Sequence, residues 1–329
     1  ARGRASPRFP APCARRAARL AMGIFVTGAT GSLGRAFVAA LRAREMPFRV
    51  LTRSVDRAKA RHPGLLDGVP CVEGGLESLG AGHLRGTRSL VLILPMAAIG
   101  RGEQELGQRA IAAAEEAGVE YLQFVSAYYQ TSRFGVVRRP LHRALLRILP
   151  RLEGKLAVEE SLRRSRLRFT VVQPTCFMQV DEWFRQYMEQ EGVYGWPVGF
   201  RRPVNRVDVR DVADAMVGLL RSVEPQQFCR LAGPENVTGE ASCQVWSKYL
   251  GRPVHYWPGS LASWADRNKE LKVHEPHEVD YMHDLLHVFN RFGAWVPPWD
   301  RRASAAAVGH PLRTYEDFVR EVGSSPAGK

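Results

Sequence analysis

The residues best suited to chemistry lie near the start of the chain, in the run Thr27-Gly28-Ala29-Thr30-Gly31-Ser32-Leu33-Gly34-Arg35. An apolar, strand-like segment precedes this run and an amphipathic, helix-like segment follows it. A glycine turn at such a junction directs backbone N–H groups and a helix N-terminus toward a pyrophosphate. The pattern predicts a dinucleotide site formed by Gly28, Thr30, Gly31, Ser32, Leu33 and Gly34. A glycine turn that binds no ligand is the alternative.

A second polar feature follows about twenty residues later, where the second predicted strand ends in Thr52-Arg53-Ser54. An Asp or Glu at this place would bind the ribose 2′-hydroxyl of NAD and repel a 2′-phosphate. Arg53, assisted by Arg57 or Lys59, can instead pair with that phosphate. We therefore expect NADP(H) to be favoured over NAD(H), with a solvated arginine at the strand end as the alternative.

These residues need a scaffold, and the first two thirds of the chain alternate strand-like with helix-like segments. That alternation is typical of a parallel sheet with helices on both faces. The expected strands are 23–27, 48–53, 70–72, 90–94, 121–125 and 169–173, and the expected helices are 33–44, 104–118, 156–164 and 209–220. The sequence predicts an α/β doubly wound parallel-sheet Rossmann fold with a smaller, interleaved C-terminal substrate lobe. We also expect Leu94 and Pro95, at the end of the fourth strand, to bind the cofactor.

Composition sets the limits of this interpretation. The 329 residues are 45% hydrophobic, which excludes a disordered or collagen-like chain and suffices for a large core with a smaller lobe. The five cysteines include no C-x-x-C pair and indicate neither a disulfide framework nor a zinc site. No apolar run is long enough to span a membrane. We expect a leader at 1–21, a Rossmann domain at 22–225 with part of 176–203 joining the substrate lobe, that lobe at 226–322, and a flexible tail at 323–329.

The formal charge of +14 is unevenly distributed. The first 22 residues contain six arginines and no acid, as in an organellar transit peptide. Met22 stands directly before the first strand, so residues 1–21 could also be read-through upstream of the true start. If Met22 is the true start, the protein is expected in the cytoplasm. If residues 1–21 are a transit peptide, it is expected in a mitochondrion or plastid.

A second basic stretch spans residues 138–168 and contains ten Arg and Lys residues. Between 141 and 149 these alternate with apolar residues at helical spacing, which predicts a basic amphipathic helix. Such a helix could bind a protein partner, an anionic membrane or nucleic acid, and a solvated face near the phosphate-binding cleft is the commoner alternative. Nucleic acid is disfavoured because no aromatic-interleaved basic motif or helix-turn-helix is visible.

Several segments together resemble the NmrA-like group of atypical short-chain dehydrogenases/reductases, which includes triphenylmethane-reductase, quinone-reductase and isoflavone-reductase-like members. The resemblance covers most of residues 22–322. The matching segments are the T-G-A-T-G-x-x-G loop and residues 152–160, 167–174, 177–179, 205–215, 231–238 and 309–318. The resemblance implies an NAD(P)-binding Rossmann fold and oxidoreductase activity.

The resemblance also implies roles for individual residues. Lys155 matches a lysine that lies near the nicotinamide ribose and assists proton transfer; the alternative is a ribose-binding or surface lysine paired with Glu159. In relatives, the residues matching Pro174, Thr175 and Phe177 line the nicotinamide side.

Three further candidates follow the fifth predicted strand, at the sheet edge where this fold binds ligands. Ser126, Tyr128 and Tyr129 are expected to contact substrate or nicotinamide, with ordinary loop packing as the alternative. Together with Lys155 they are the catalytic candidates, and Ser126 and Lys155 are also counted as cofactor-binding.

The chain departs from the family pattern in two places. Glu73-Gly74-Gly75 replaces the usual Gly-Asp after the third strand, so the expected adenine contact is in doubt. The Tyr-x-x-x-Lys of ordinary short-chain dehydrogenases is missing, because Ser132 and Arg133 stand four residues beyond the two tyrosines. An arginine cannot assist a tyrosine in proton relay as that lysine does.

Four histidines, His274, His277, His283 and His287, lie close together in sequence. His283-Asp284-Leu285-Leu286-His287 lacks the glutamate of H-E-x-x-H, so we expect a helix of the second lobe and no metal.

The preferred hypothesis is an NADPH-dependent reductase of a small quinone, enone or other carbonyl compound. The alternative is a non-catalytic NADP(H)-binding redox sensor, assembly factor or accessory subunit.

Overall fold

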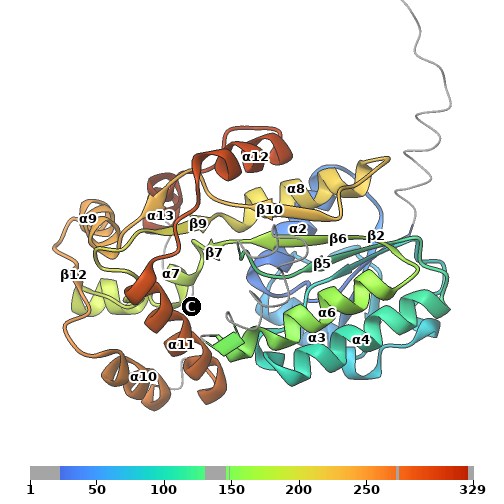
Figure 1. The fold of residues 1–329 in the computed structure, drawn as a ribbon, viewed down its shortest axis with the longest axis horizontal. Helices are drawn as coiled ribbons and strands as arrows, with labels where there is room; N and C mark the ends of the chain where they lie inside the picture. The colour runs from blue at the N-terminus through green and yellow to red at the C-terminus, as the bar shows by residue number, and fades with distance from the viewer. Residues whose placement is uncertain (1–22, 130–145, 148, 272–273, 325–329) are drawn as a thin grey trace, which may run out of the picture.

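The computed structural model describes residues 23–129, 146–147, 149–271 and 274–324. A parallel sheet with helices on both faces forms the larger part, and a smaller lobe lies beside it (Figure 1). The leader with Met22, Ser132 and Arg133, the first part of the basic stretch and residues 325–329 lie outside the described residues.

The sheet has seven parallel strands in the order β10-β6-β5-β4-β1-β2-β3. They are β1 (Ile24–Val26), β2 (Phe48–Thr52), β3 (Cys71–Glu73), β4 (Ser89–Leu92), β5 (Tyr121–Val125), β6 (Arg168–Pro174) and β10 (Phe228–Leu231). Every residue of the central strands β4 and β5 is buried, as expected for strands covered on both faces. Strands β1 to β3 follow one another toward one side of the sheet, and β4, β5 and β6 follow one another toward the other side. The strand order therefore reverses between β1 and β4, which is where doubly wound sheets bind ligands. The predicted fold class is confirmed.

Helices cover both faces of this sheet (Figure 1). One face carries α2 (Ser32–Ala43), α3 (Val55–Arg61), α8 (Val209–Arg221) and α12 (Pro298–Val308), and the other carries α4 (Arg101–Glu116) and α6 (Glu153–Arg164). Phe37, Val38 and Leu41 of α2 are buried against the sheet, as its amphipathic pattern predicts. Short 3₁₀ turns lie at Leu76–Ser78, Ala81–Leu84, Met96–Ala98 and Pro150–Leu152.

The seventh strand was missed by the sequence analysis. β10 lies in a stretch that the sequence placed outside the parallel-sheet pattern, yet it pairs with β6 in parallel. Arg230 interrupts its apolar residues, so it lacks the continuous apolar run that ends β4. Helix α12 covers it, and the Ala232 amide donates to the Ser304 hydroxyl over 2.8 Å.

The smaller lobe has its own aromatic core. Its strands are β7 (Cys176–Phe177), β9 (Val204–Val207) and β11 (Asn236–Val237) in one sheet, and β8 (Val193–Tyr194) with β12 (His255–Tyr256) in another. Its helices are α7 (Val180–Trp183), a π-helical turn (Tyr187–Glu191), α9 (Gly239–Leu250), α10 (Leu261–Glu270), α11 (Pro276–Phe292) and α13 (Tyr315–Ser324). Trp196, Trp246 and Trp264 are buried at its centre.

A buried ion pair links the elements of this lobe. The Asp181 carboxylate accepts hydrogen bonds from Arg206 at 3.1 Å and 3.2 Å, from Tyr194 at 2.9 Å, from Trp246 at 3.2 Å and from Tyr315. The Arg206 guanidinium also lies 5.0 Å from the centre of the Tyr315 ring. These contacts join α7, β9, β8, α9 and α13.

The chain passes more than once between the two parts. It leaves the large sheet after β6, returns for α8 and β10, leaves again for α9 to α11, and returns once more for α12. No described helix combines the length and apolar character needed to cross a membrane.

Candidate functional site

The glycine loop between β1 and α2 contains two kinds of glycine. Gly28 has φ +67°, and a Cβ there would lie 2.7 Å from the Ile93 carbonyl oxygen; a Cβ on Gly34 would lie 2.0 Å from the Gly28 oxygen. The fold itself therefore requires these two glycines. A Cβ on Gly31 would meet only the Gly28 oxygen at an ordinary 3.6 Å. No described side chain caps α2, so its first N–H groups have no side-chain acceptor among the described residues.

Hydrogen bonds join the residue that follows β4 to the start of this loop. The Thr27 hydroxyl donates to the Ile93 carbonyl over 3.0 Å and accepts from the Ile93 amide over 2.9 Å. This exchange holds the chain ends of β1 and β4 side by side, so the half-buried Leu94 and the exposed Pro95 follow directly at the edge of the glycine loop.

Arg53 and Arg57 follow the end of β2, and Lys59 lies in the last turn of α3. Arg53, Arg57 and Lys59 are all exposed, and none of them has an ion-pair partner among the described residues. Glu73, at the position of the doubtful adenine contact, instead accepts a hydrogen bond from the Val55 amide over 2.9 Å at the start of α3. The cations are therefore free to bind an anionic group at this end of the sheet.

Lys155 pairs across two helices with a residue that sequence reasoning missed. Its Nζ contacts the Glu103 carboxylate; the Lys155 side chain is 17% exposed and that of Glu103 is 1% exposed. The predicted alternative pairing of Lys155 with Glu159 is wrong, because Glu159 lies on the face of α6 that turns toward the sheet. Sequence spacing carried no signal for this pair, since α4 and α6 meet only in the folded chain.

Two of the predicted catalytic residues lie together around that buried Glu159. Ser126 Oγ donates to Glu159 Oε1 over 2.6 Å, Gln173 Nε2 donates to it over 3.2 Å, and the Tyr129 hydroxyl donates to it as well. Burial raises the pKa of Glu159 and holds the pKa of Tyr129 well above its usual value. Ser126 and Tyr129 are thus engaged in an internal polar cluster and are themselves buried.

The remaining edge candidates are held in the same way by neighbouring elements. The Tyr128 hydroxyl donates to Asp300 of α12 over 2.7 Å, and its amide donates to the Pro174 carbonyl over 2.8 Å. Thr175 donates to the Asn205 side chain over 3.0 Å, and the half-buried Phe177 packs against the core beneath α2 and α8. The ends of β1, β4, β5 and β6 thus bring the predicted residues to one edge, and Arg53 follows β2 farther along it. Lys59 lies in the last turn of α3, within electrostatic range of Cys71 at the start of β3.

The smaller lobe adds a phenol to this edge. Tyr281 of α11 lies within electrostatic range of Glu103 and Cys176, and burial, followed by the Glu103 carboxylate, raises the pKa of its hydroxyl. Arg151 pairs with Asp284 over 3.2 Å, which brings the same helix to the start of α6. Neither contact had a sequence signal.

The histidine cluster does lie on the predicted helix of the smaller lobe. His283 and His287 are on α11 with ring centres 4.6 Å apart. His274, before the helix, packs on Trp183 at 4.9 Å, and its Nδ1 lies 3.6 Å from a Glu278 oxygen.

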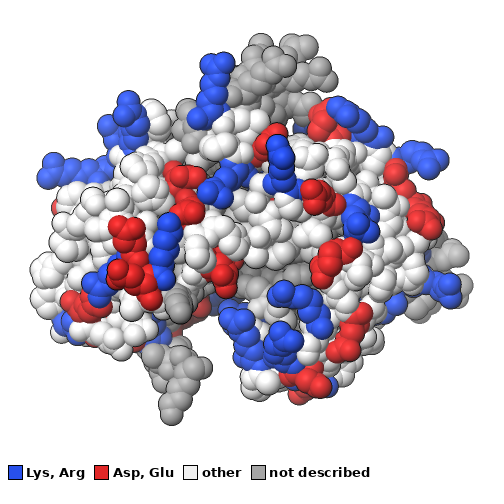
Figure 2. Space-filling model, turned by 90° about the horizontal axis from the view of Figure 1, so that it is seen from below, with Lys and Arg blue, Asp and Glu red and all other residues white. Residues whose placement is uncertain are grey.

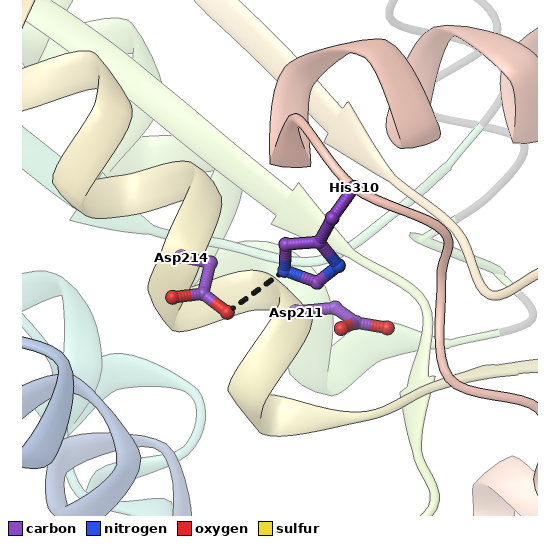
Figure 3. A group of neighbouring side chains, drawn as sticks. All are labelled: Asp211, Asp214 and His310. Carbon is purple, nitrogen blue, oxygen red and sulfur yellow. Dashed lines mark hydrogen bonds and ion pairs between the residues drawn. The ribbon is translucent and has the colours of Figure 1, made fainter.

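A different group of side chains has the spacing of metal ligands. Asp211, Asp214 and His310 bring ligand atoms within 4.8 Å of one another, and Figure 3 shows the imidazole between the two carboxylates. Arg44 pairs with Asp214 over 2.7 Å, and Arg313 pairs with Asp211. Because two guanidinium groups already neutralise the carboxylates, the group is an ion-pair network that joins α2, α8 and the 309–314 segment.

The strand order and the glycine loop define a doubly wound Rossmann protein, with the loop at the place where the strand order reverses between β1 and β4. The model of the NmrA-like family matches residues 22–296, and the chain belongs to that family. The NAD(P)H azoreductase of Xenophilus azovorans is 26% identical over 306 residues, which cover 90% of this chain and 96% of the azoreductase.

Solved structures share the fold. The NADPH-dependent quinone oxidoreductase of Escherichia coli in complex with NADPH has a TM-score of 0.73 at 20% identity, covering 91% of this chain and 99% of that one. The triphenylmethane reductase of Citrobacter sp. in complex with NADP(H) has a TM-score of 0.71 at 20% identity, with the same coverage.

Proposed function

We propose that this protein is an NADPH-dependent reductase of a small quinone, enone or other carbonyl compound. The observation that carries the proposal is the uncapped N-terminus of α2 beside Gly31, which shares the sheet edge with Lys155. The names of the relatives support the acceptor class, because an azo dye, a quinone and a triphenylmethane dye are all conjugated electron acceptors.

The residues at the edge suit NADP(H). The N–H groups of the 28–34 loop would bind the pyrophosphate, and the space beside Gly31 leaves room for it. Arg53, with Arg57 or Lys59, would bind the 2′-phosphate, which favours NADPH over NADH. Leu94, Pro95, Pro174 and Phe177 would border the nicotinamide. When bound, the reduced nucleotide supplies the hydride.

Among the catalytic candidates, Lys155 is favoured as the proton donor. Its side chain is partly open to solvent, whereas Ser126 and Tyr129 donate to buried Glu159 and Tyr128 donates to Asp300. These three residues would then shape the edge of the site and keep the loop after β5 in place.

The non-catalytic alternative draws on the missing Tyr-x-x-x-Lys and on a partner bound through residues 138–168. Three described arginines of that stretch have partners within the chain: Arg151 pairs with Asp284, Arg164 pairs with Glu160, and Arg168 donates to the Val223 carbonyl. On the face in Figure 2, basic and acidic side chains are mixed over most of the surface, with one group of basic residues in the lower half.

The test is NADPH oxidation, followed by absorbance, against a panel of a benzoquinone, an enone, an aldehyde, an azo dye and a triphenylmethane dye. NADPH affinity is measured in parallel by calorimetry, and NADH is compared under the same conditions. Oxidation that needs both protein and one acceptor class supports the reductase. Tight NADPH binding without oxidation by any acceptor would overturn it in favour of the non-catalytic alternative.

A further inference from the structure

Glu103 is a buried carboxylate with a single partner. One of its oxygens contacts Lys155 Nζ, and the other is buried with no hydrogen-bond partner among the described residues. Leaving a buried carboxylate oxygen unpaired costs free energy. Packing alone therefore does not explain an acid at this position.

The backbone is built to bring Glu103 to Lys155. A Cβ on Gly154 would lie 2.1 Å from the Gly100 carbonyl oxygen and 3.0 Å from the Glu103 Cβ. A Cβ on Gly107 would likewise lie 2.2 Å from a methyl group of Val158. Glycine at both positions lets α4 and α6 approach backbone to backbone, and any larger residue would push Glu103 away from the lysine.

The position of Glu103 in α4 also suits an acidic side chain. It lies in the first turn of α4, where the helix dipole stabilises an anion. The other acid within reach along α6, Glu159, is already occupied by Ser126, Gln173 and Tyr129. Glu103 is thus the counterion available to Lys155 at this edge.

We propose that Glu103 is a positioning residue that holds the Lys155 ammonium in place as the proton donor to the reduced acceptor. This inference rests on the proposed reductase function. The acceptor gains a hydride from the reduced nicotinamide and a proton from Lys155 Nζ. The nicotinamide is left oxidised and the lysine is left as a neutral amine, which regains a proton from solvent at its exposed fraction of 17%.

The test compares Glu103→Gln with Glu105→Gln, a matched change on the exposed side of the same helix. The first readout needs no turnover: an amine-reactive label is added to the free protein, and the labelling rate of Lys155 is followed by peptide mass spectrometry. We expect about tenfold faster labelling in Glu103→Gln, because the reagent reacts with the neutral amine and a decrease of one pKa unit raises the neutral fraction about tenfold. Glu105→Gln should leave the labelling rate unchanged.

The second readout is the pH profile of kcat with the best acceptor. In Glu103→Gln, kcat is expected to fall about tenfold with the KM for NADPH unchanged, and the alkaline limb is expected to move to lower pH because the ammonium holds its proton less tightly. Glu103→Asp keeps the charge but shortens its reach, so labelling should stay near wild type while kcat falls.

The outcomes separate the two proposals. Wild-type labelling of Lys155 in Glu103→Gln would overturn the positioning role whether or not any acceptor is reduced. An unmoved pH profile would do so too. Faster labelling in a protein whose wild type reduces no acceptor would leave the ion pair standing and refute the proton-donor role together with the reductase.

Discussion

Two buried carboxylates, one in each part of the molecule, are treated very differently by their surroundings. Asp181 in the smaller lobe accepts hydrogen bonds from four side chains on four other elements. Among the residues that the structure describes, Glu103 at the edge of the large sheet has one partner and one unpaired oxygen. The four donors to Asp181 hold the elements of the smaller lobe together. Glu103 has only Lys155 as its described partner, so this ion pair is available to act on a ligand. Burial alone does not distinguish the two roles; the number of partners does.

The largest expected effect separates the two carboxylates by stability. Asp181→Ala leaves the buried Arg206 without its counterion and should lower the free energy of unfolding by about 3–5 kcal/mol. Glu103→Gln keeps the shape of the side chain and leaves Lys155 partly open to solvent, so its cost should be clearly smaller than that of Asp181→Ala. Urea denaturation of both variants measures the difference. Equal losses of unfolding free energy would contradict the distinction between a structural role for Asp181 and a role in chemistry for Glu103.

A second prediction applies the same contrast to the glycine loop. Gly31→Ala adds a methyl group at the α2 N-terminus, where it makes only an ordinary contact with the Gly28 oxygen, so NADPH affinity should fall about 10- to 100-fold with little change in melting temperature. Gly34→Ala should lower the melting temperature as well, because its Cβ collides with the Gly28 backbone. Calorimetric titration and thermal unfolding of both variants test this. Unchanged affinity in Gly31→Ala would place the pyrophosphate elsewhere.

A third prediction concerns the exposed end of β2. Arg53→Ala should weaken NADPH binding about tenfold, through loss of a charge-assisted hydrogen bond, and leave NADH binding as it was. Titration with both nucleotides gives the ratio, and Arg42→Ala, an exposed arginine of α2 that binds the Gly64 and Leu65 carbonyls, serves as control. An equal loss for NADH would argue against the 2′-phosphate contact.

The smallest expected effect is pH-dependent stability at His310. Hydrogen bonds to the Pro311 carbonyl and to Asp214 raise the His310 pKa above its usual value (Figure 3). A raised folded-state pKa gives stability that is present below about pH 6.5 and is lost as the pH rises through the folded value. His310→Gln should therefore lower the melting temperature at about pH 5.5 and have almost no effect at about pH 8.5. The loss stays below about 1 kcal/mol because the pair is partly exposed. A larger loss at the higher pH would contradict the sign.

The parts that sequence reasoning predicted are those with local patterns. The first six strands and the 28–34 loop follow from runs of apolar residues and from glycine spacing within one βαβ unit. Parallel strands then bring their ends to one edge, which is why Ser126 and Pro174 lie near the loop without any contact being visible in the sequence.

The rest depends on packing between distant segments. Spacing of four residues favoured a Lys155–Glu159 pair, but Glu159 lies on the buried face of α6 beside Leu162, and Glu103 comes from a helix 52 residues earlier. Tyr281 reaches the site only because α11 of the smaller lobe lies over the edge. The strand-like run around Cys229 carried no sign that it joins the large sheet, since its pairing with β6 forms only in the folded chain.

The repeated passage of the chain between the two parts has a consequence for how this protein can change. Neither part is encoded by one continuous segment, since β10 and α12 of the large sheet are separated by the helices of the smaller lobe. A single cut leaves no fragment with a complete core, and the smaller lobe cannot be exchanged as a cassette. New acceptors must be accommodated by individual substitutions along α11 and the sheet edge.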